Sequence, residues 1–290
     1  MKKIILLMPT YNDWDSLAKL LEEINSVTRN FKDFQFKCII VNDCSTLEQP
    51  KIFKPKSFIS LKIINMKENR GHARCNAFGL RYINTNETYD YVIIMDSDGE
   101  DRPVEIKDLI NTIVKKPENS VVAKRVKRSE GFIFQTLYQI HKFITLVFTG
   151  KKVNFGNYSC LTKKDVIILS DKASLWSSFS GSIKKNLKNL NATDSIRGLR
   201  YFGPSKMSLL NLIIHSFSII AVFKYTVFLR STFIIILLSF LINILGSIAI
   251  ILQILIVLFN LLIFIVSMRE SQKALIESNK NLLNENEIAY

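Results

Sequence analysis

The stretch Tyr91-Val92-Ile93-Ile94-Met95-Asp96-Ser97-Asp98-Gly99-Glu100-Asp101-Arg102-Pro103 joins an apolar run to a cluster of acids. The apolar run is aromatic and β-branched, which predicts a buried strand. Asp96, Asp98 and Glu100 follow at alternate positions, and an extended backbone would direct all three carboxylates to one side. Converging carboxylates repel one another unless a cation lies between them, and Mg²⁺ or Mn²⁺ suits oxygen ligands of this kind. The same acids would also fit a loop that caps the next helix. The rest of the sequence is needed to choose between a metal site and a capping loop.

Short apolar runs alternate with segments of helical periodicity in the first half of the chain. The predicted strands are Ile4–Met8, Lys37–Val41, Leu61–Ile64, Tyr91–Met95 and Ser120–Ala123. Strands that alternate with helices predict an α/β fold with a Rossmann-like, mostly parallel sheet. Polar clusters follow the first four strands, at Asn12, Asp43, Asn69–Arg74 and Asp96–Glu100. Because the carboxyl ends of parallel strands meet at one edge, we expect a single ligand crevice there.

The chain carries a formal net charge of +14, and most of it lies in one region. Between Lys115 and Lys206 there are 18 lysines and arginines but only 5 acids. A basic zone beside a membrane favours anionic lipid headgroups or a phosphate-bearing substrate as partners. No nucleic-acid-binding motif accompanies the charge, so we expect no nucleic acid partner. The 4 cysteines show no metal-ligand spacing, and nothing in the sequence requires disulfides.

No charged residue occurs between Ser231 and Met268, which predicts a membrane segment. A single helix over Thr232–Met268 would be about 55 Å long against a hydrocarbon core of about 30 Å. We therefore expect two helices joined by a turn near Asn243–Ser247. Such a hairpin returns the chain to the side on which it entered, and the bias of positive charge places that side in the cytoplasm. The expected location is the cell membrane (inner membrane), with the main domain and both termini cytoplasmic.

These features predict four parts in chain order. Residues 1–204 form the α/β domain, 205–230 an interfacial amphipathic helix region, 231–268 the transmembrane hairpin and 269–290 a polar, partly helical cytoplasmic tail. The three histidines show no metal-ligand spacing, and we interpret His215 as part of an interfacial polar stripe rather than as a catalytic residue. The residues leave the oligomeric state open, a homo-oligomer included.

Several motifs follow the order found in family 2 glycosyltransferases of the GT-A fold. Pro9-Thr10-Tyr11-Asn12 resembles the family's Pro-x-Tyr-Asn, and Val41-Asn42-Asp43-Cys44-Ser45 resembles its Val-Asp-Asp-Gly-Ser. Asn69-Arg70-Gly71-His72-Ala73-Arg74-Cys75-Asn76 resembles Asn-x-Gly-x-Ala-x-Ala-x-Asn, and Asp96-Ser97-Asp98 resembles the metal motif. The sequence departs from the pattern at Asn42, which replaces the first acid of a pair, and at Glu100, which replaces a glutamine.

The resemblance implies a site for a UDP- or GDP-linked sugar donor with Mg²⁺ or Mn²⁺ as cofactor. The implied metal ligands are Asp96, Asp98 and Glu100, and Asp98 is also implied as catalytic. The implied donor-binding residues are Pro9, Tyr11, Asn12, Asp43, Gly71, Arg74, Asp96 and Ser97. Judged from the residues alone, Asp43 also fits a turn or helix cap, and Arg74 also fits a surface arginine.

Further along, the chain looks like the dolichyl- or polyprenyl-phosphate sugar transferases. Arg125-Val126-Lys127-Arg128 resembles their Arg-x-x-Arg, and the segment from Arg197 to Lys206 resembles their Arg-x-x-Arg-x-x-Gly-x-Ser-Lys. The segment from Asn154 to Ser159 departs from their Asp-x-x-Gly-Phe-Arg and lacks both its acid and its arginine. The resemblance implies a polyprenyl phosphate acceptor, with Arg125 also catalytic. The implied acceptor-phosphate residues are Arg125, Arg128, Arg200, Ser205 and Lys206.

The absence of an obvious general base also favours a phosphate acceptor. An alcohol acceptor requires a general base, normally a carboxylate, and the second half of the domain offers no obvious spare one. A phosphate acceptor is already anionic and requires cations that hold it. We therefore predict a metal-dependent hexosyltransferase of cell-envelope biogenesis. The alternatives are the same donor with a different lipid-linked or saccharide acceptor, and a catalytically inactive membrane protein of binding or assembly.

Overall fold

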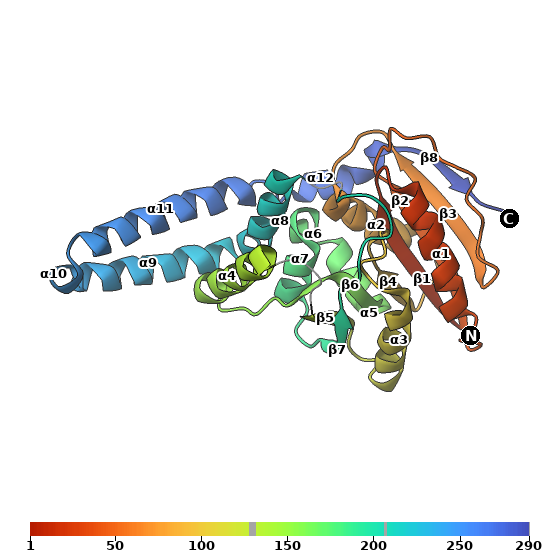
Figure 1. Cartoon of the computed structure of the whole chain (residues 1–290), viewed down its shortest axis with the longest axis horizontal. Coiled ribbons are helices and arrows are strands. Elements are labelled where there is room, and N and C mark those ends of the chain that lie inside the picture. Colours follow the sequence, from red (N-terminus) through yellow and green to blue (C-terminus); the bar gives the residue numbers. More distant parts are fainter. Residues whose placement is uncertain (128–131, 206–207, 290) are drawn as a thin grey trace.

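The protein is a mixed α/β sheet domain from which a helical hairpin projects (Figure 1). The computed structural model describes residues 1–127, 132–205 and 208–289. The strands are β1 Lys2–Thr10, β2 Phe34–Asn42, β3 Phe58–Met66, β4 Tyr91–Ile94, β5 Val121–Lys127, β6 Phe155–Thr162, β7 Asn191–Ile196 and β8 Leu282–Glu287. The helices are α1 Trp14–Thr28, α2 His72–Asn86, α3 Ile106–Lys115, α4 Phe132–Thr149, α5 Lys163–Ser170, α6 Ala173–Ser177, α7 Phe179–Asn186, α8 Leu209–Ala221, α9 Lys224–Phe240, α10 Ile242–Leu245, α11 Ser247–Ser267 and α12 Gln272–Ile276, with 3₁₀ turns at Pro103–Glu105 and Glu277–Asn281.

The sheet has the order β7-β5-β6-β4-β1-β2-β3-β8. Its centre, β4-β1-β2-β3, is parallel, so the carboxyl ends of these four strands lie at one edge. β6 runs antiparallel between β4 and β5, and β7 pairs parallel to β5. The α/β prediction is confirmed, and each predicted strand overlaps an observed one. β6, β7 and β8 lie outside the five strands predicted from the sequence.

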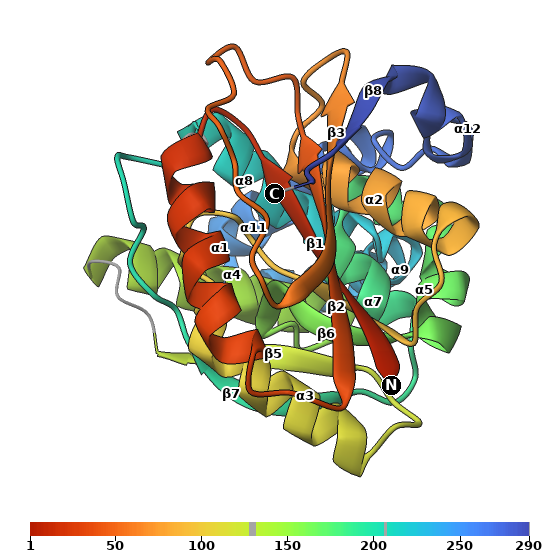
Figure 2. The same cartoon turned by 90° about the vertical axis from the view of Figure 1, so that its right-hand side faces the viewer.

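Two hydrophobic cores fill the two faces of the sheet. Alternate residues of β1 point to opposite faces, so Ile4, Leu6 and Met8 pack with α1 and α3. Ile5 and Leu7 pack with α2, α5 and α7 on the other face. In Figure 2, α1 and α2 lie on opposite sides of the strands. Because helices cover both faces of the central strands, the ends of the strands remain available for a site.

The hairpin consists of α9 and α11, joined by α10 and by Gly246 with φ of 56°. Gln253 of α11 donates to the carbonyl of Ile235 at 3.2 Å and to Ser239 at 2.9 Å, which fixes the two helices against each other. Most large apolar side chains of α11 are exposed, as Ile251, Leu255 and Leu258 are. An apolar surface of this extent is typical of contact with lipid or a partner.

The length of the hairpin suits a membrane. Among the described residues, one helix, within Ser247–Asn281, is long and apolar enough to cross a bilayer, with a mean hydropathy of 3.1. The number of possible membrane-spanning helices in this part of the chain rises to two if α8 and α9, which are bent by 83° at their junction, are taken as one broken span. The turn lies where the sequence predicted it. α9 is continuous from Lys224, so the helix begins before the predicted boundary at residue 231 and inside the region expected to be interfacial.

The C-terminal segment rejoins the sheet of the α/β domain. It is partly helical, as expected, but it is not a free tail: β8 pairs antiparallel with β3 at the edge of the sheet. The Tyr82 hydroxyl donates to Glu285 at 2.6 Å, and Asn65 donates to Asn284 at 2.7 Å. Both ends of the hairpin therefore connect to the same domain, on the same side of any membrane that the hairpin enters.

Candidate active site

The acidic loop after β4 lies at the shared edge of the parallel strands. The Asp96 side chain accepts a hydrogen bond from Asn157 of β6 at 3.0 Å, and its backbone N–H donates to Asp101 at 2.9 Å. Burial opposes ionisation of Asp96, but His72, the Asn157 hydrogen bond and two arginines outweigh it and lower its pKa. Burial and the neighbouring Asp96 raise the pKa of Asp101 well above its usual range. The surroundings thus favour a negative charge on Asp96 over one on Asp101.

Asp98 lies beside Asp96 and pairs with an arginine from a distant segment. Arg200 donates to its carboxylate at 2.7 Å, and the same guanidinium also pairs with Asp13. The other Asp98 oxygen accepts the backbone N–H of Glu100 at 3.0 Å. Burial and repulsion from Asp96 raise the pKa of Asp98 to about 6, although Arg200 and Arg197 oppose the change. Arg200 was predicted to bind the acceptor phosphate, but here its guanidinium is engaged by two carboxylates.

The three predicted metal ligands do not converge in this structure. Glu100 forms an ion pair with Arg197, which turns its carboxylate toward that arginine. Among the described residues, no group of three or more histidine, cysteine, aspartate or glutamate side chains is placed to hold a metal by itself. Asp96 and Asp98 remain as a carboxylate pair. Two carboxylates fit Mg²⁺ or Mn²⁺ when water and substrate phosphates supply the other ligands.

The segment from Arg197 to Gly203 covers the acidic loop. Its backbone donates from Gly198 to the Glu100 carbonyl at 2.8 Å and from Tyr201 to the Asp98 carbonyl at 3.0 Å. The ring of Tyr201 lies directly on Gly99, whose φ is +89°, and a side chain at that position would clash with the ring. The acidic loop and its cover thus form one unit.

The predicted donor-binding residues lie on the neighbouring strand ends. Asp43, which is 3% exposed, accepts the backbone N–H groups of Arg70 and Gly71 at 2.8 and 2.7 Å and thereby shapes the start of α2. Asn12, with φ of 50°, binds the loop after β2 through the N–H groups of Thr46 and Leu47. These contacts show the turn-forming role of Asp43. Pro9 lies within β1, Tyr11 follows its end, and Ser97 is buried in the acidic loop.

Arg74 lies close to Arg269, at the end of the hairpin. It donates to the Arg70 carbonyl at 2.9 Å, and its guanidinium lies over the ring of Trp176, 5.7 Å from the centroid. Burial, Arg269 and Arg70 together lower the pKa of Arg74 to about 10. Arg269 directly follows α11 and was not predicted, because no local pattern marks it as a neighbour of α2.

The residues predicted to bind the acceptor phosphate differ in where the structure places them. Arg125 of β5 packs its guanidinium on Gly156 of β6, next to Asn157, and lowers the pKa of Asp96. Ser205 is exposed. Arg128 and Lys206 lie outside the described residues. Among the described residues, Arg125 and Arg200 are thus the predicted acceptor residues that lie beside the acids.

Two histidines also reach this site. His72, in the first turn of α2, lies against His215 of α8 with ring centroids 5.1 Å apart. His72 lowers the pKa of Asp96, and burial, His72 and Arg125 hold the pKa of His215 well below its ordinary value. The interpretation of His215 as a purely interfacial residue missed this contact. Helical periodicity places His215 on the polar side of α8, but only the tertiary fold shows what that side meets.

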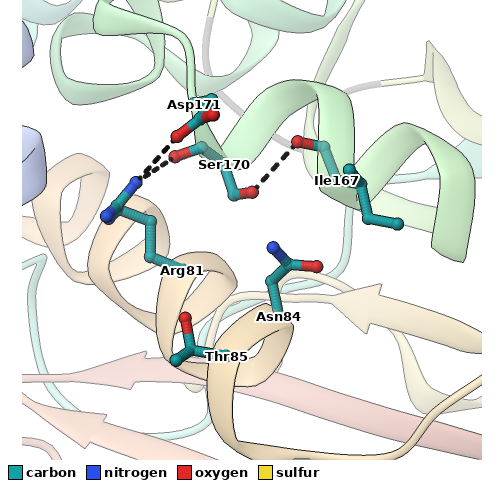
Figure 3. Close-up of a pocket in the computed structure, with 6 residues that line it drawn as sticks. All are labelled: Arg81, Asn84, Thr85, Ile167, Ser170 and Asp171. Carbon is teal, nitrogen blue, oxygen red and sulfur yellow. Dashed lines mark hydrogen bonds and ion pairs between the residues drawn. The ribbon is translucent and has the colours of Figure 1, made fainter.

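A separate polar hollow lies between α2 and α5 (Figure 3). Arg81 donates there to the Ser170 carbonyl at 2.9 Å and to Asp171 at 3.2 Å. The other lining residues are Asn84, Thr85 and Ile167. All come from the C-terminal half of α2 or from α5 and its end, whereas His72 at the other end of α2 meets the acids. We therefore do not assign the chemistry to this hollow.

Comparison with known proteins identifies a sequence family. The family described as glycosyl transferase family 2 matches residues 5–196, well over half of the chain. A relative from Photorhabdus laumondii, undecaprenyl-phosphate 4-deoxy-4-formamido-L-arabinose transferase, is 25% identical over 167 residues, which are 56% of this chain and 48% of the relative. An uncharacterised protein of Methanocaldococcus jannaschii is 23% identical over 113 residues, 38% of this chain and 46% of that protein. The chain thus spans about half the length of the curated relatives it matches.

Solved structures show the same fold. Glucosyl-3-phosphoglycerate synthase from Mycobacterium tuberculosis, in complex with Mn²⁺, uridine diphosphate and phosphoglyceric acid, has a TM-score of 0.53 at 12% identity, covering 78% of each chain. The same enzyme with Mn²⁺, UDP-glucose and phosphoglyceric acid has a TM-score of 0.51 at 14% identity, covering 78% of this chain and 80% of that chain. Likeness at this identity concerns the GT-A fold alone.

Proposed function

Because the chain belongs to glycosyl transferase family 2, we propose that it transfers a sugar from a UDP- or GDP-linked donor to polyprenyl phosphate at the cytoplasmic face of the cell membrane. The family membership makes it a glycosyltransferase. The donor, the lipid acceptor and the side of the membrane are the proposal. The relative from Photorhabdus laumondii, named for an undecaprenyl-phosphate substrate, supports the lipid class.

The donor diphosphate would lie at the carboxyl ends of β1, β2 and β4. Asp96 and Asp98 would hold a divalent metal together with that diphosphate, as their chemistry suits and as the Mn²⁺ in structures of the same fold supports. When bound, the metal neutralises the charge that develops on the leaving diphosphate. Asn157 fixes the orientation of Asp96, and Arg200 does the same for Asp98. Glu100 is left out of this set because Arg197 engages it.

The acceptor phosphate would attack the anomeric carbon of the sugar. A phosphate oxygen forms the new carbon–oxygen bond while the bond to the diphosphate breaks, and the nucleoside diphosphate leaves with the electron pair. No proton has to be removed from an anionic phosphate, so no general base is required. Arg125 supplies a fixed positive charge next to Asn157 and Asp96, where this oxygen would have to lie.

The single observation that best supports the proposal is the position of the hairpin next to the acidic edge of the sheet. Its helices leave the domain through α8, whose His215 touches the acidic edge, and return beside Arg74 at the start of α2. The exposed apolar hairpin and the catalytic edge therefore adjoin each other. A substrate whose reactive phosphate is attached to a membrane-bound chain suits that arrangement.

The experiment compares Arg125→Ala with its neighbour Lys124→Ala as control, since Lys124 is exposed and 4.0 Å from Asp194. A charge-assisted contact to phosphate contributes about 1.5–3 kcal/mol, so Arg125→Ala should weaken apparent acceptor affinity roughly ten- to a hundredfold. Donor affinity should change little, and Lys124→Ala should resemble the wild type. Steady-state kinetics with each substrate varied provides the test. Loss of donor affinity with unchanged acceptor affinity would assign Arg125 to the nucleotide and contradict the proposal.

A second candidate keeps the donor and replaces the phosphate acceptor with a lipid-linked or saccharide hydroxyl. The observation in its favour is the pair of imidazoles beside Asp96, because a neutral imidazole can act as a general base. Arg125 at the same edge favours the anionic acceptor. Transfer assays with both acceptor types separate the two.

A further inference from the structure

The imidazoles of α2 and α8 occupy a position that none of the family motifs explains. His215 lies outside every motif quoted above, and His72 fills an unspecified position of its motif. The rings are 5.1 Å apart and inclined by 56°. Asp96, Arg125 and His141 of α4 are all close enough to change the pKa of His215. All three histidines of the chain thus gather where the interfacial helices meet the acidic edge.

The helix that carries His215 faces two environments. On its outer side, Leu210, Leu212 and Ile213 are exposed, as expected for a helix that lies against lipid. On its inner side, His215 meets His72, which is close enough to Asp96 to affect its pKa. A lipid lying along α8 would therefore reach the acids past these two rings.

We infer that His72 and His215, together with Arg125, form the subsite that holds the phosphate of the membrane-bound acceptor, and this inference rests on the proposed function. An imidazole presents at least one N–H donor in either protonation state, and phosphate oxygens accept such hydrogen bonds strongly. Two imidazole N–H donors beside one guanidinium would hold the phosphate oxygens from more than one direction. His215 selects for a headgroup that reaches the edge from the lipid side, because α8 is the element that carries it.

The test uses the full chain in liposomes that contain polyprenyl phosphate. His215→Leu removes the N–H donor at similar volume, whereas His215→Gln retains one. His215→Leu should raise the KM for the acceptor about tenfold or more, because a hydrogen bond to a charged group is lost. The donor KM should stay within about twofold of wild type, the scale of a fraction of a kcal/mol. His215→Gln should restore most of the acceptor affinity. Asn211→Ala, an exposed position one turn earlier on α8, is the matched control and should leave both constants unchanged.

Three results bear on the inference. Equal increases in the donor and acceptor KM, or no change with His215→Leu, would overturn the subsite while the wild-type reaction still supports the proposed function. Transfer by the wild type to a hydroxyl acceptor instead of polyprenyl phosphate would overturn the proposed function and the subsite with it. If His215→Leu does not fold, His72→Leu provides the same test from α2, with an unchanged donor KM as the sign of an intact domain.

Discussion

Asp98 is the residue whose charge the account depends on most. Asp98→Asn keeps the size of the side chain and an oxygen that can accept the Glu100 N–H, but it removes the charge that pairs with Arg200 and that the proposed metal would need. We expect transfer to fall at least about a hundredfold, the scale of losing one charged contact of about 3 kcal/mol. Asp194→Asn, an exposed acid on β7, is the control. Full activity of Asp98→Asn with the same metal dependence would contradict the assignment.

Glu87, away from the acidic loop, makes the stability of the fold depend on pH. It pairs with Lys37 at 2.7 Å and Lys62 at 3.2 Å. Burial opposes its ionisation, but the two lysines outweigh burial and lower the pKa of Glu87. The folded-state pKa is lower than that of the unfolded chain, so the ion pairs stabilise the fold above about pH 4.3, and the gain is lost as the pH falls through the lowered pKa.

Glu87→Gln should therefore lower the free energy of unfolding by about 1–3 kcal/mol at pH 7, and the difference from wild type should shrink toward pH 3. Glu118→Gln, at an exposed position, is the control. Thermal unfolding at several pH values measures both variants. A difference that is independent of pH would show that charge is not the cause.

Residues whose role depends on the adjoining sequence could be predicted from it. The acids after β4 and the turn residues after β1 and β2 are local to a strand end, so period-two spacing and turn chemistry identify them. The ion pair of Glu100 with Arg197 could not be predicted, because Arg197 lies almost a hundred residues away, and the role of Glu100 as a metal ligand stays a prediction. His215 and Arg269 were missed for the same reason. Their role comes from α8 and α11 packing against the sheet, which no local pattern records.

At the scale of elements, β8 is the main departure from the sequence prediction. Its residues, Leu282-Leu283-Asn284-Glu285-Asn286-Glu287, are mostly polar and resemble a solvated tail. As the edge strand of the sheet, it needs little apolar surface, and its backbone pairs with β3. The central strands were predictable because they are buried on both faces and therefore apolar throughout.

The return of the chain through β8 makes a definite prediction of topology. A C-terminal tag should be protected from a protease added outside intact cells, because β8 pairs with β3 in the catalytic domain. A protease site inserted at Gly246, in the turn between α10 and α11, should be cut under the same conditions and serves as the positive control. Cleavage of the C-terminal tag from outside would show that the chain crosses the membrane an odd number of times.

At the scale of the whole molecule, the hairpin is fastened to the catalytic domain at its base. Glu270, just after α11, pairs with Lys224 at the start of α9 at 3.6 Å and with Lys185 of α7 at 3.8 Å. Lys185 also donates to the Val222 carbonyl at 2.9 Å. The two ends of the hairpin are thus held to each other and to the domain, which keeps the acidic edge at a fixed distance from the apolar surface.

The nucleophile that we propose is the phosphate of a membrane lipid. The most direct measurement supplies purified full-length protein with radiolabelled UDP- and GDP-sugars and Mg²⁺ or Mn²⁺, in liposomes that contain either polyprenyl phosphate or the matching polyprenol. We expect label to enter the lipid fraction only with polyprenyl phosphate, and to stop doing so when the metal is chelated. Label transferred to polyprenol or to a saccharide, with polyprenyl phosphate left unmodified, would contradict the account.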